Sequence, residues 1–276
     1  MPIALIRIAL FVSALLVGLV GCGYSFTVYA AEEGKVVSRD WTFDGVFGYY
    51  DKASLQRGFK VYREVCAACH GLEYVAFRDF AGLGYSADEI KAIASEYEVE
   101  DGPNDEGEYF TRLATAADKI PNPFANENAA RAANNGAYPV DLSLIVKARP
   151  NGANYLYSLL TSYIETPPNT DVPEGMHFNI AFSGNMIAMP QPLYGDDVSF
   201  DGVVNGDGNP IIVDTSMDGL AADVVAFLAW ASEPKMEVRK RTGIAVMVFL
   251  LVLCFVSYGA MQHTWAEVKP KKRKKK

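Results

Sequence analysis

The chain has 276 residues, half of them hydrophobic, and a formal net charge of −8. That length accommodates one sizeable domain together with membrane segments, and the composition excludes a chain that is disordered throughout. The charge is unevenly placed, because residues 31–234 hold 31 Asp and Glu against 13 Lys and Arg, a net of −18. A domain this acidic repels nucleic acid and favours basic protein partners.

The first apolar run covers residues 3–20. Small residues and the stretch TVYAAEEG follow it, which is typical of a secretory signal peptide cleaved near Ala30 or Ala31. We predict that residues 1–30 are this signal. Two alternatives stay open: the stretch LVGC, which ends at Cys22, is similar to a lipoprotein cleavage box, and the run is otherwise a retained anchor.

Helical patterns are recognisable in four stretches. Residues 52–66 place apolar side chains at a spacing close to one helix face, so this helix is expected to run into a pair of cysteines. A second helix is expected to start at Ser86, with Glu89 completing a capping box. Two or three short helices are expected over 126–168, separated by turn sequences, and a last amphipathic helix over 218–234.

Loops are expected in two regions. Residues 166–214 are rich in Pro, Gly, Asn and Asp and show little helical period, and loops of such length are usually functional or wrap around something. Within them GNPIIVD, residues 208–214, is the best candidate for a small hairpin. The acidic stretch EYEVEDGPNDEGE over 96–108 is interpreted on composition alone as a solvated loop, with a docking surface as the alternative.

The second apolar run, Gly243 to Met261, has 19 residues without a charge, which is long enough to cross a bilayer as a helix. A buried core helix is the alternative, but four basic residues precede the run and seven follow it. This excess indicates a cytoplasmic C-terminus. We predict a periplasmic domain over 31–234, a linker and membrane helix over 235–261, and a basic cytoplasmic tail over 262–276.

The stretch CAACH places Cys66 and Cys69 directly before His70, which is the C-x-x-C-H attachment site of c-type haem. Both sulfurs can add to one porphyrin, and the histidine is then placed to bind the iron. A dithiol redox pair would follow a strand, and a structural zinc site would need more Cys or His nearby. The sequence therefore predicts one covalent haem c, with His70 as an iron ligand.

The second axial ligand is sought among the methionines downstream in the domain, because a Met partner suits electron transfer. Met189 in NMIAMPQPLYG is favoured, since two nearby prolines can fix its loop, and Met186 is the next candidate. Met176 and Met217 complete the set, and each of the four is otherwise explained by core packing. His177 is a further alternative ligand, although a lone histidine in a loop is more often a surface residue.

Several segments in order resemble the cytochrome c1 family, the haem-bearing subunits of the cytochrome bc1 complex. The segments are WTFDGVFG at 41–48, LQRGFKVYREVCAACH at 55–70, EYVAFRD at 73–79, EVEDGPNDEGE at 98–108, NENAARAANNGAYPVDLS at 126–143, ARPNGANYLYSLLTSY at 148–163, NMIAMPQPLY at 185–194 and DVVAFLAWASEP at 223–234. A lone C-x-x-C-H motif would indicate any cytochrome c. The ordered set with a C-terminal anchor is far more specific.

The resemblance implies roles for individual residues. The family's methionine ligand falls in a Met-x-Pro-Pro-Leu/Ile loop, which corresponds to Met189 here. Its haem-propionate contacts fall on Arg149 and Tyr155, with Arg131 as a weaker candidate, and an arginine fork suits a carboxylate. The chain departs from the family at Val140, where a proline is frequent.

Another departure concerns a disulfide that some bacterial relatives carry in the haem domain. Here Cys22 belongs to the predicted signal region and Cys254 to the predicted membrane helix, so no such bridge is expected.

The resemblance also implies fold, function and partners. The expected fold is an all-α, class I cytochrome c-like domain with long loop insertions and one C-terminal transmembrane helix. The expected function is electron transfer in quinol:cytochrome c oxidoreductase, in which the chain passes electrons from the Rieske iron–sulfur protein to a basic cytochrome c. The chain is expected to lie beside cytochrome b in a dimeric complex of the cell inner membrane. The acidic stretch then becomes a partner-facing surface.

Two other functions stay open from the residues alone. One is a tethered cytochrome subunit of a terminal oxidase or reductase. The other is a haem-based sensor, which would need an open sixth position on the iron.

Overall fold

The computed structural model describes residues 34–168, 170–200 and 212–266. The predicted signal peptide, the possible lipid attachment at Cys22 and the end of the basic tail therefore lie outside the described residues. Most of the hairpin expected at GNPIIVD lies outside them as well, and residues 212–214, which are described, are irregular.

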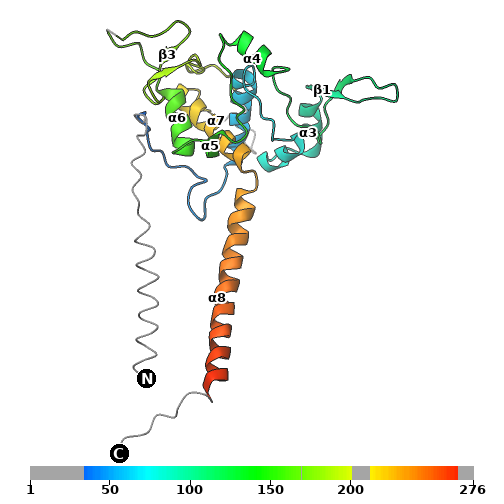
Figure 1. Ribbon diagram of the computed structural model, residues 1–276, viewed down its shortest axis with the longest axis vertical. Helices are drawn as coiled ribbons and strands as arrows, with labels where there is room; N and C mark the ends of the chain where they lie inside the picture. The colour runs from blue at the N-terminus through cyan, green and yellow to red at the C-terminus, as the bar shows by residue number, and fades with distance from the viewer. Residues whose placement is uncertain (1–33, 169, 201–211, 267–276) are drawn as a thin grey trace, which may run out of the picture. The chain divides into compact units, whose positions relative to one another are not determined.

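The centre of the domain is the crossing of helices α2 (Lys52–Val61) and α7 (Met217–Ser232) (Figure 1). The backbones approach closely at Gly58, where an added Cβ would lie 2.0 Å from the carbonyl oxygen of Asp223. The buried carboxylate of Asp223 accepts hydrogen bonds from Arg57 (Nη2–Oδ1 2.8 Å) and from the Ser54 hydroxyl (2.5 Å). The crossing is therefore fixed by a small residue and by a paired buried charge.

Aromatic side chains fill the space around this crossing. The ring of Phe59 on α2 lies 4.6 Å from that of Phe80 and 5.6 Å from that of Phe227, and Phe227 stacks on Trp230 at 5.8 Å. All four side chains are buried. Such ring pairs contribute about 0.5–1.5 kcal/mol each beyond the burial of their surface.

Helix α2 continues into a π-helical turn, η1 (Tyr62–Cys66), which confirms the expected helix over 52–66. A 3₁₀ helix, η2 (Phe77–Leu83), and α3 (Ala87–Ala94) follow. The capping box at the start of α3 is present: the backbone N–H of Ser86 donates to the Glu89 carboxylate at 2.7 Å, and the N–H of Glu89 donates to the Ser86 hydroxyl at 3.4 Å.

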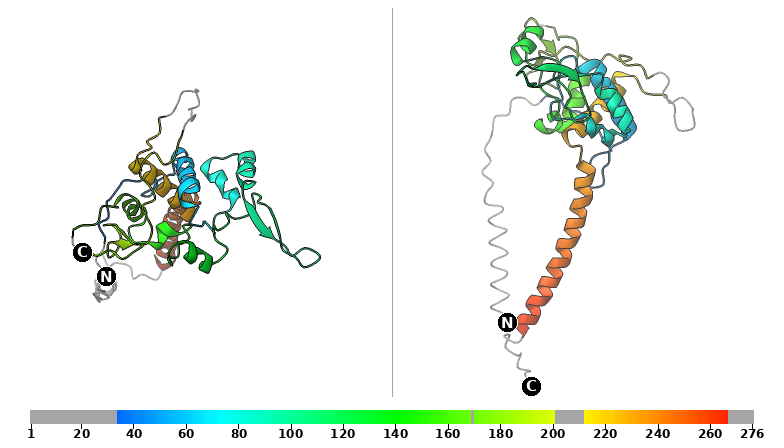
Figure 2. Two further views of the ribbon diagram at one scale, coloured as in Figure 1. Left: turned by 90° about the horizontal axis from the view of Figure 1, so that it is seen from above. Right: turned by 90° about the vertical axis from the view of Figure 1, so that its right-hand side faces the viewer.

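The acidic stretch is only in part the solvated loop that its composition suggested, because residues 102–108 form an exposed turn whereas residues 98–101 form a strand. Strands β1 (Glu98–Asp101) and β2 (Phe110–Leu113) pair antiparallel, with Glu98 opposite Leu113, and the hairpin projects away from the helices (Figures 1 and 2). Arg112 bridges the carboxylates of Asp101 and Asp118, the latter at 2.7 Å, and so ties the hairpin to the chain that follows it.

Three short helices lie within 126–168, as expected: α4 (Glu127–Ala133), α5 (Ile145–Ala148) and α6 (Gly152–Thr161). Beyond them, the described part of the 166–214 region is mostly irregular but contains a small hairpin that the sequence did not predict. Its strands are β3 (His177–Phe178) and β4 (Met186–Ile187), which pair antiparallel.

Helix α7 is buried on nearly all sides, so its expected amphipathic character is wrong. The physical reason is that α2, α5 and α6 all pack against it. After Pro234 the chain enters α8 (Met236–Ala266), 31 residues with a mean hydropathy of 2.5 in its most apolar part. Among the described residues it is the one helix that is long and apolar enough to cross a membrane. The exposed side chains along it fit a single membrane span.

Candidate haem-binding site

The Cys-x-x-Cys-His stretch begins in the π-helical turn and ends in a tight turn. The N–H of Ala67 donates to the carbonyl of Tyr62 at 2.8 Å, and the N–H groups of Cys69 and His70 both donate to the carbonyl of Cys66, at 3.1 and 2.9 Å. Single π-helical turns are frequent at functional sites. Both cysteines are half-buried thiols, so their sulfurs are free to form thioethers.

The side chain of His70 is oriented by one hydrogen bond. Its Nδ1 lies 2.7 Å from the carbonyl oxygen of Val140, and because a carbonyl only accepts, Nδ1 carries the proton. The lone pair of Nε2 is then available for a metal. Burial lowers the pKa of His70 below its ordinary value, which keeps the imidazole neutral, as a ligand must be.

The segment that supplies this carbonyl is anchored against the Cys-x-x-Cys-His turn. The N–H of Leu142 donates to the carbonyl of Gly71 at 2.9 Å, and the Asp141 carboxylate accepts from the N–H of Glu73 at 2.8 Å. A Cβ on Gly71 would lie 2.0 Å from Oδ1 of Asn122, so a larger residue here would displace the Asn122 side chain. The acceptor of His70 is therefore held in place even though residue 140 is Val rather than Pro.

The thiol chemistry argues against a redox dithiol. Burial, with a smaller contribution from Cys69, raises the pKa of the Cys66 thiol to about 12. Disulfide exchange requires a thiolate, which at neutral pH forms readily only where the pKa is low. The Cys66 thiol is thus poorly suited to reversible disulfide exchange.

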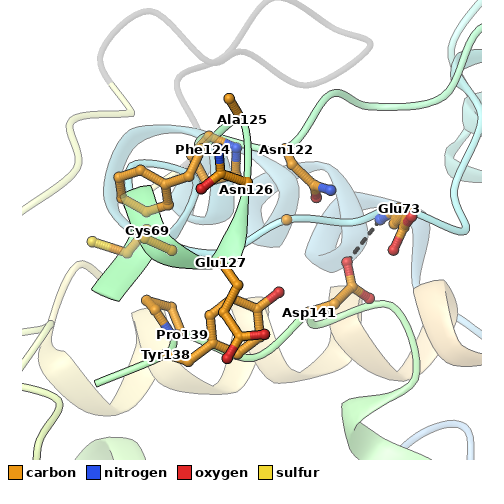
Figure 3. A pocket seen from close by; sticks show the side chains of 13 residues that line it. Cys69, Glu73, Asn122, Phe124, Ala125, Asn126, Glu127, Tyr138, Pro139 and Asp141 are labelled. Atoms are coloured by element: carbon orange, nitrogen blue, oxygen red, sulfur yellow. Dashed lines mark hydrogen bonds between the residues drawn. The ribbon is translucent and has the colours of Figure 1, made fainter. Parts of the chain in front are cut away.

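A pocket of about 110 Å³ lies beside Cys69. Figure 3 shows that Phe124, Glu127, Tyr138 and Asp141 line it around the cysteine. The pocket is smaller than most small-molecule sites, which measure ~300–1,000 Å³, and it borders the attachment turn at Cys69.

The Met189 loop is fixed by polar contacts of its backbone. The hydroxyl of Tyr163 donates to the carbonyl of Met189 at 3.0 Å, and the side-chain amide of Gln191 donates to the carbonyl of Leu193 at 2.7 Å. Leu193 is buried in the same hydrophobic core as Leu142, which follows the His70 acceptor. The two loops that carry the expected iron ligands are thus packed against one core.

The other ligand candidates lie in less suitable places. Met186 belongs to β4, opposite Phe178 of β3, and the thioether of Met217 lies 3.7 Å from the side-chain amide of Gln191. His177 is exposed on β3, and Met176 beside it is half-buried.

The three expected propionate contacts differ from one another. Arg149 has no carboxylate partner among the described residues. Burial raises the pKa of Tyr155 on α6, and the nearby positive charge of Arg149 partly opposes this rise. Arg131 instead pairs with Glu127 at 2.7 Å and donates to the carbonyl of Gly136 at 2.9 Å. Arg149 and Tyr155 are therefore available to a haem carboxylate, whereas Arg131 is already engaged.

Comparison with known proteins identifies the family. A family model described as the cytochrome C1 family matches residues 41–268. The chain belongs to the cytochrome c1 family. The mitochondrial "Cytochrome c1, heme protein" of Schizosaccharomyces pombe is 46% identical over 242 residues, which cover 87% of this chain and 76% of that protein. As a cytochrome c1, the chain carries one covalently attached c-type haem, and the C-x-x-C-H stretch lies where its attachment is expected.

Further relatives agree. "Cytochrome c1" of Rhodospirillum rubrum is 43% identical over 257 residues, 87% of this chain and 91% of that protein. The "Cytochrome b-c1 complex catalytic subunit, mitochondrial" of Candida albicans is 42% identical over 268 residues, 93% of this chain and 90% of that protein. Cytochrome c1 is the haem subunit of the cytochrome bc1 complex, so this chain is an electron-transfer component of such a complex rather than a subunit of a terminal oxidase.

Sequence reasoning missed two residues of the site. Tyr163 holds the Met189 loop, and Val140 supplies the acceptor for His70 through its backbone. Val140 was noted in the sequence only as a departure from the family, and neither contact could be predicted, because both join segments that are distant along the chain.

Proposed function

We propose that Cys66 and Cys69 hold the haem through thioether bonds and that His70 and Met189 are its axial ligands. The single observation that carries this assignment is the hydrogen bond from Nδ1 of His70 to the carbonyl of Val140, which leaves Nε2 free. When bound in this way, the haem supplies a one-electron carrier whose potential a Met ligand raises.

Met189 is supported as the second ligand by the way its loop is constrained. Pro190 and Pro192 restrict the backbone on either side of Gln191, and the Tyr163 hydroxyl fixes the carbonyl of Met189. Because the loop is already stiff, it loses little conformational entropy when its thioether binds a metal. Met186, in contrast, lies in strand β4, and no comparable contact to its backbone carbonyl from a tyrosine is observed among the described residues.

Arg149 and Tyr155 would orient the haem through a propionate. The Arg149 guanidinium can donate two charge-assisted hydrogen bonds to a carboxylate, and the Tyr155 hydroxyl can donate a third. Neither has a competing carboxylate partner among residues 34–168, 170–200 and 212–266.

Within the complex, the chain would take single electrons from the Rieske iron–sulfur protein and deliver them to a basic cytochrome c. The acidic hairpin supports this direction. Glu98, Glu100, Glu106 and Glu108 are exposed and form no ion pair in the described part of the chain, whereas Asp101 is paired with Arg112. Unpaired acidic groups on a projecting hairpin attract a basic partner and speed its encounter.

The membrane arrangement follows from α8 and its flanking charges. The basic excess after the apolar run favours a cytoplasmic C-terminus, so the haem domain would lie on the periplasmic side of the cell inner membrane. The exposed apolar surface of α8 would pack against cytochrome b and lipid in a dimeric complex.

The ligand assignment is tested by replacing Met189 with Leu and, as a matched control in the same hairpin region, Met186 with Leu. We expect Met189→Leu to abolish the methionine–iron charge-transfer band and to lower the reduction potential by on the order of 0.1–0.3 V, within the range that axial ligands span. Met186→Leu should leave both unchanged. If only Met186→Leu changes the band and the potential, Met186 is the ligand. If neither variant changes them, the ligand is not a methionine of this region.

A further inference from the structure

The loop formed by residues 41–50, here named the membrane-side loop, has an inner and an outer set of side chains. The inner set packs together: the rings of Trp41 and Phe43 stack at 5.3 Å, and those of Phe43 and Tyr50 lie 5.6 Å apart. The outer set projects into open space, with Phe47 86% and Val46 63% exposed. A large apolar side chain exposed to this extent on a well-anchored loop calls for a partner.

The loop is bound directly to the start of α8. The ammonium group of Lys240 donates to the carbonyls of Phe43 at 2.7 Å and Gly48 at 3.4 Å, and the N–H of Tyr50 donates to the Glu237 carboxylate at 2.7 Å. Figures 1 and 2 show the loop beside the first turns of α8. The chain segment between the two carbonyls that Lys240 holds contains the exposed tip.

This attachment sets the height of the tip along the membrane helix. Lys240 lies three residues before Gly243, where the uncharged run begins. At 1.5 Å per residue, the backbone of Lys240 lies about 5 Å along the helix axis from that of Gly243. The loop that the Lys240 side chain holds therefore lies beside the end of α8 at which the apolar run begins.

The shape and composition of the tip suit a membrane interface. Gly45 adopts a φ of +69° and no atom lies within 4 Å of the position its Cβ would take, so the turn is uncovered by the rest of the described chain. Tyr49, which is 59% exposed, is a residue type enriched at membrane interfaces. Asp44 on the same turn carries a charge, which limits insertion to the interfacial region.

We propose that the membrane-side loop is a second point of membrane contact, at which Val46 and Phe47 insert into the lipid interface beside α8. A single helix leaves a domain free to tilt and rotate above the bilayer, whereas a second contact on a braced loop fixes its orientation. The occupant is phospholipid rather than protein, because the most exposed large side chains of the tip, Val46 and Phe47, are apolar and the loop is held against the beginning of the membrane helix.

Photo-crosslinking in native membranes tests this proposal. Phe47 is replaced by the photoreactive analogue p-benzoyl-phenylalanine in the full-length chain, and the products of irradiation are separated and weighed by mass spectrometry. We expect a phospholipid adduct at position 47 and a second one when Val46 carries the analogue. The same replacement of Tyr109, an exposed aromatic at the β1–β2 hairpin, is the control and should give no lipid adduct.

The outcomes separate the possible partners of the tip. An adduct to cytochrome b, or none to lipid, at both positions 46 and 47 would overturn the proposal, as would equal lipid labelling at position 109. An unchanged haem spectrum shows that each variant is folded, and both tip positions are exposed, Val46 to 63% and Phe47 to 86%, so the larger analogue can extend into open space.

Discussion

The hydroxyl of Tyr163 donates a 3.0 Å hydrogen bond to the backbone carbonyl of Met189. Tyr163 follows α6 and pairs through an isolated bridge with Asn179, whose buried side-chain amide donates to the carbonyl of Leu159 at 2.8 Å. The loop proposed to present the iron ligand is thus tied to α6 through a tyrosine and a buried asparagine.

Tyr163→Phe should loosen this loop while conserving its packing. Loss of the hydrogen bond costs about 1 kcal/mol, so the methionine should be displaced from ferric iron about 0.7 pH unit earlier on alkaline titration. The measurement follows the methionine–iron charge-transfer band against pH. Tyr194→Phe is the control, since Tyr194 lies in the same loop but is 71% exposed. Identical titrations of both variants and the unmodified protein would show that Tyr163 does not stabilise the ligand.

Gly58→Ala tests the close crossing of α2 and α7. The new methyl group would lie 2.0 Å from the carbonyl oxygen of Asp223, so the helices must separate. Overpacking of this kind costs about 1–3 kcal/mol in the free energy of unfolding. Denaturant unfolding of the haem-loaded protein in detergent measures it, with the exposed Lys52→Ala in the same helix as the control. A loss below about 0.5 kcal/mol, the range of ordinary surface changes, would contradict the observed crossing.

The junction of α7 and α8 should respond to acid. A hydrogen bond from Arg239, supported by Lys147, lowers the pKa of Glu233 from its ordinary 4.5 to about 2. Because the folded pKa lies below the unfolded one, the ionised carboxylate stabilises the fold above about pH 4.5, and this stabilisation is lost as pH falls toward 2.

Glu233→Gln should therefore reduce thermal stability at pH 7 by roughly 0.5–1 kcal/mol, since the pair is near the surface. The difference from the unmodified protein should shrink progressively below pH 4.5 and vanish near pH 2. Thermal unfolding at several pH values measures it. A difference that does not change with pH would mean that the ion pairs to Lys147 and Arg239 contribute nothing.

The acidic hairpin should control the encounter with cytochrome c. Replacing Glu100, Glu106 and Glu108 with Gln removes three unpaired charges, and we expect the rate of reduction of a basic cytochrome c to fall by on the order of tenfold at low salt. That deficit should disappear at high ionic strength.

A matched control removes the same charge elsewhere in the domain, by amide replacements at Glu165, Asp171 and Glu174, which are also exposed. It should retain most of the low-salt rate. If both triple variants reduce cytochrome c equally slowly at low salt, the loss of rate is due to net charge alone. If the rate does not depend on salt, electrostatic attraction does not guide the docking of cytochrome c.

Much of this architecture can be read from local sequence. The helix that runs into the cysteine pair, the Ser86–Glu89 cap and the membrane helix each depend on spacings within one segment, and all three are present. The hairpin over 98–113 is different, because a run of Asp, Glu and Gly is typical of a loop. Its two strands are joined by the Arg112–Asp101 ion pair, and Arg112 also binds Asp118 beyond the hairpin.

Helix α7 shows the same limit of local reasoning. The segment 218–234 was predicted to be amphipathic, yet the carboxylate of its Asp223 is buried against Arg57 and Ser54 of α2. A charge that is paired across the core cannot be distinguished in sequence from one that faces solvent. The Val140 acceptor and the Tyr163 contact were hidden for a related reason, since each is a tertiary contact made to or from the backbone.

The most direct test of the account is to purify the tagged chain from native membranes in mild detergent and to follow its haem spectrum during addition of quinol. We expect b-type haem and an iron–sulfur protein to purify with the chain, and quinol to reduce its c-type haem in a reaction that depends on the iron–sulfur protein. A c-type spectrum without b-type haem, or a c-type haem that stays oxidised while b-type haem is reduced, would contradict it.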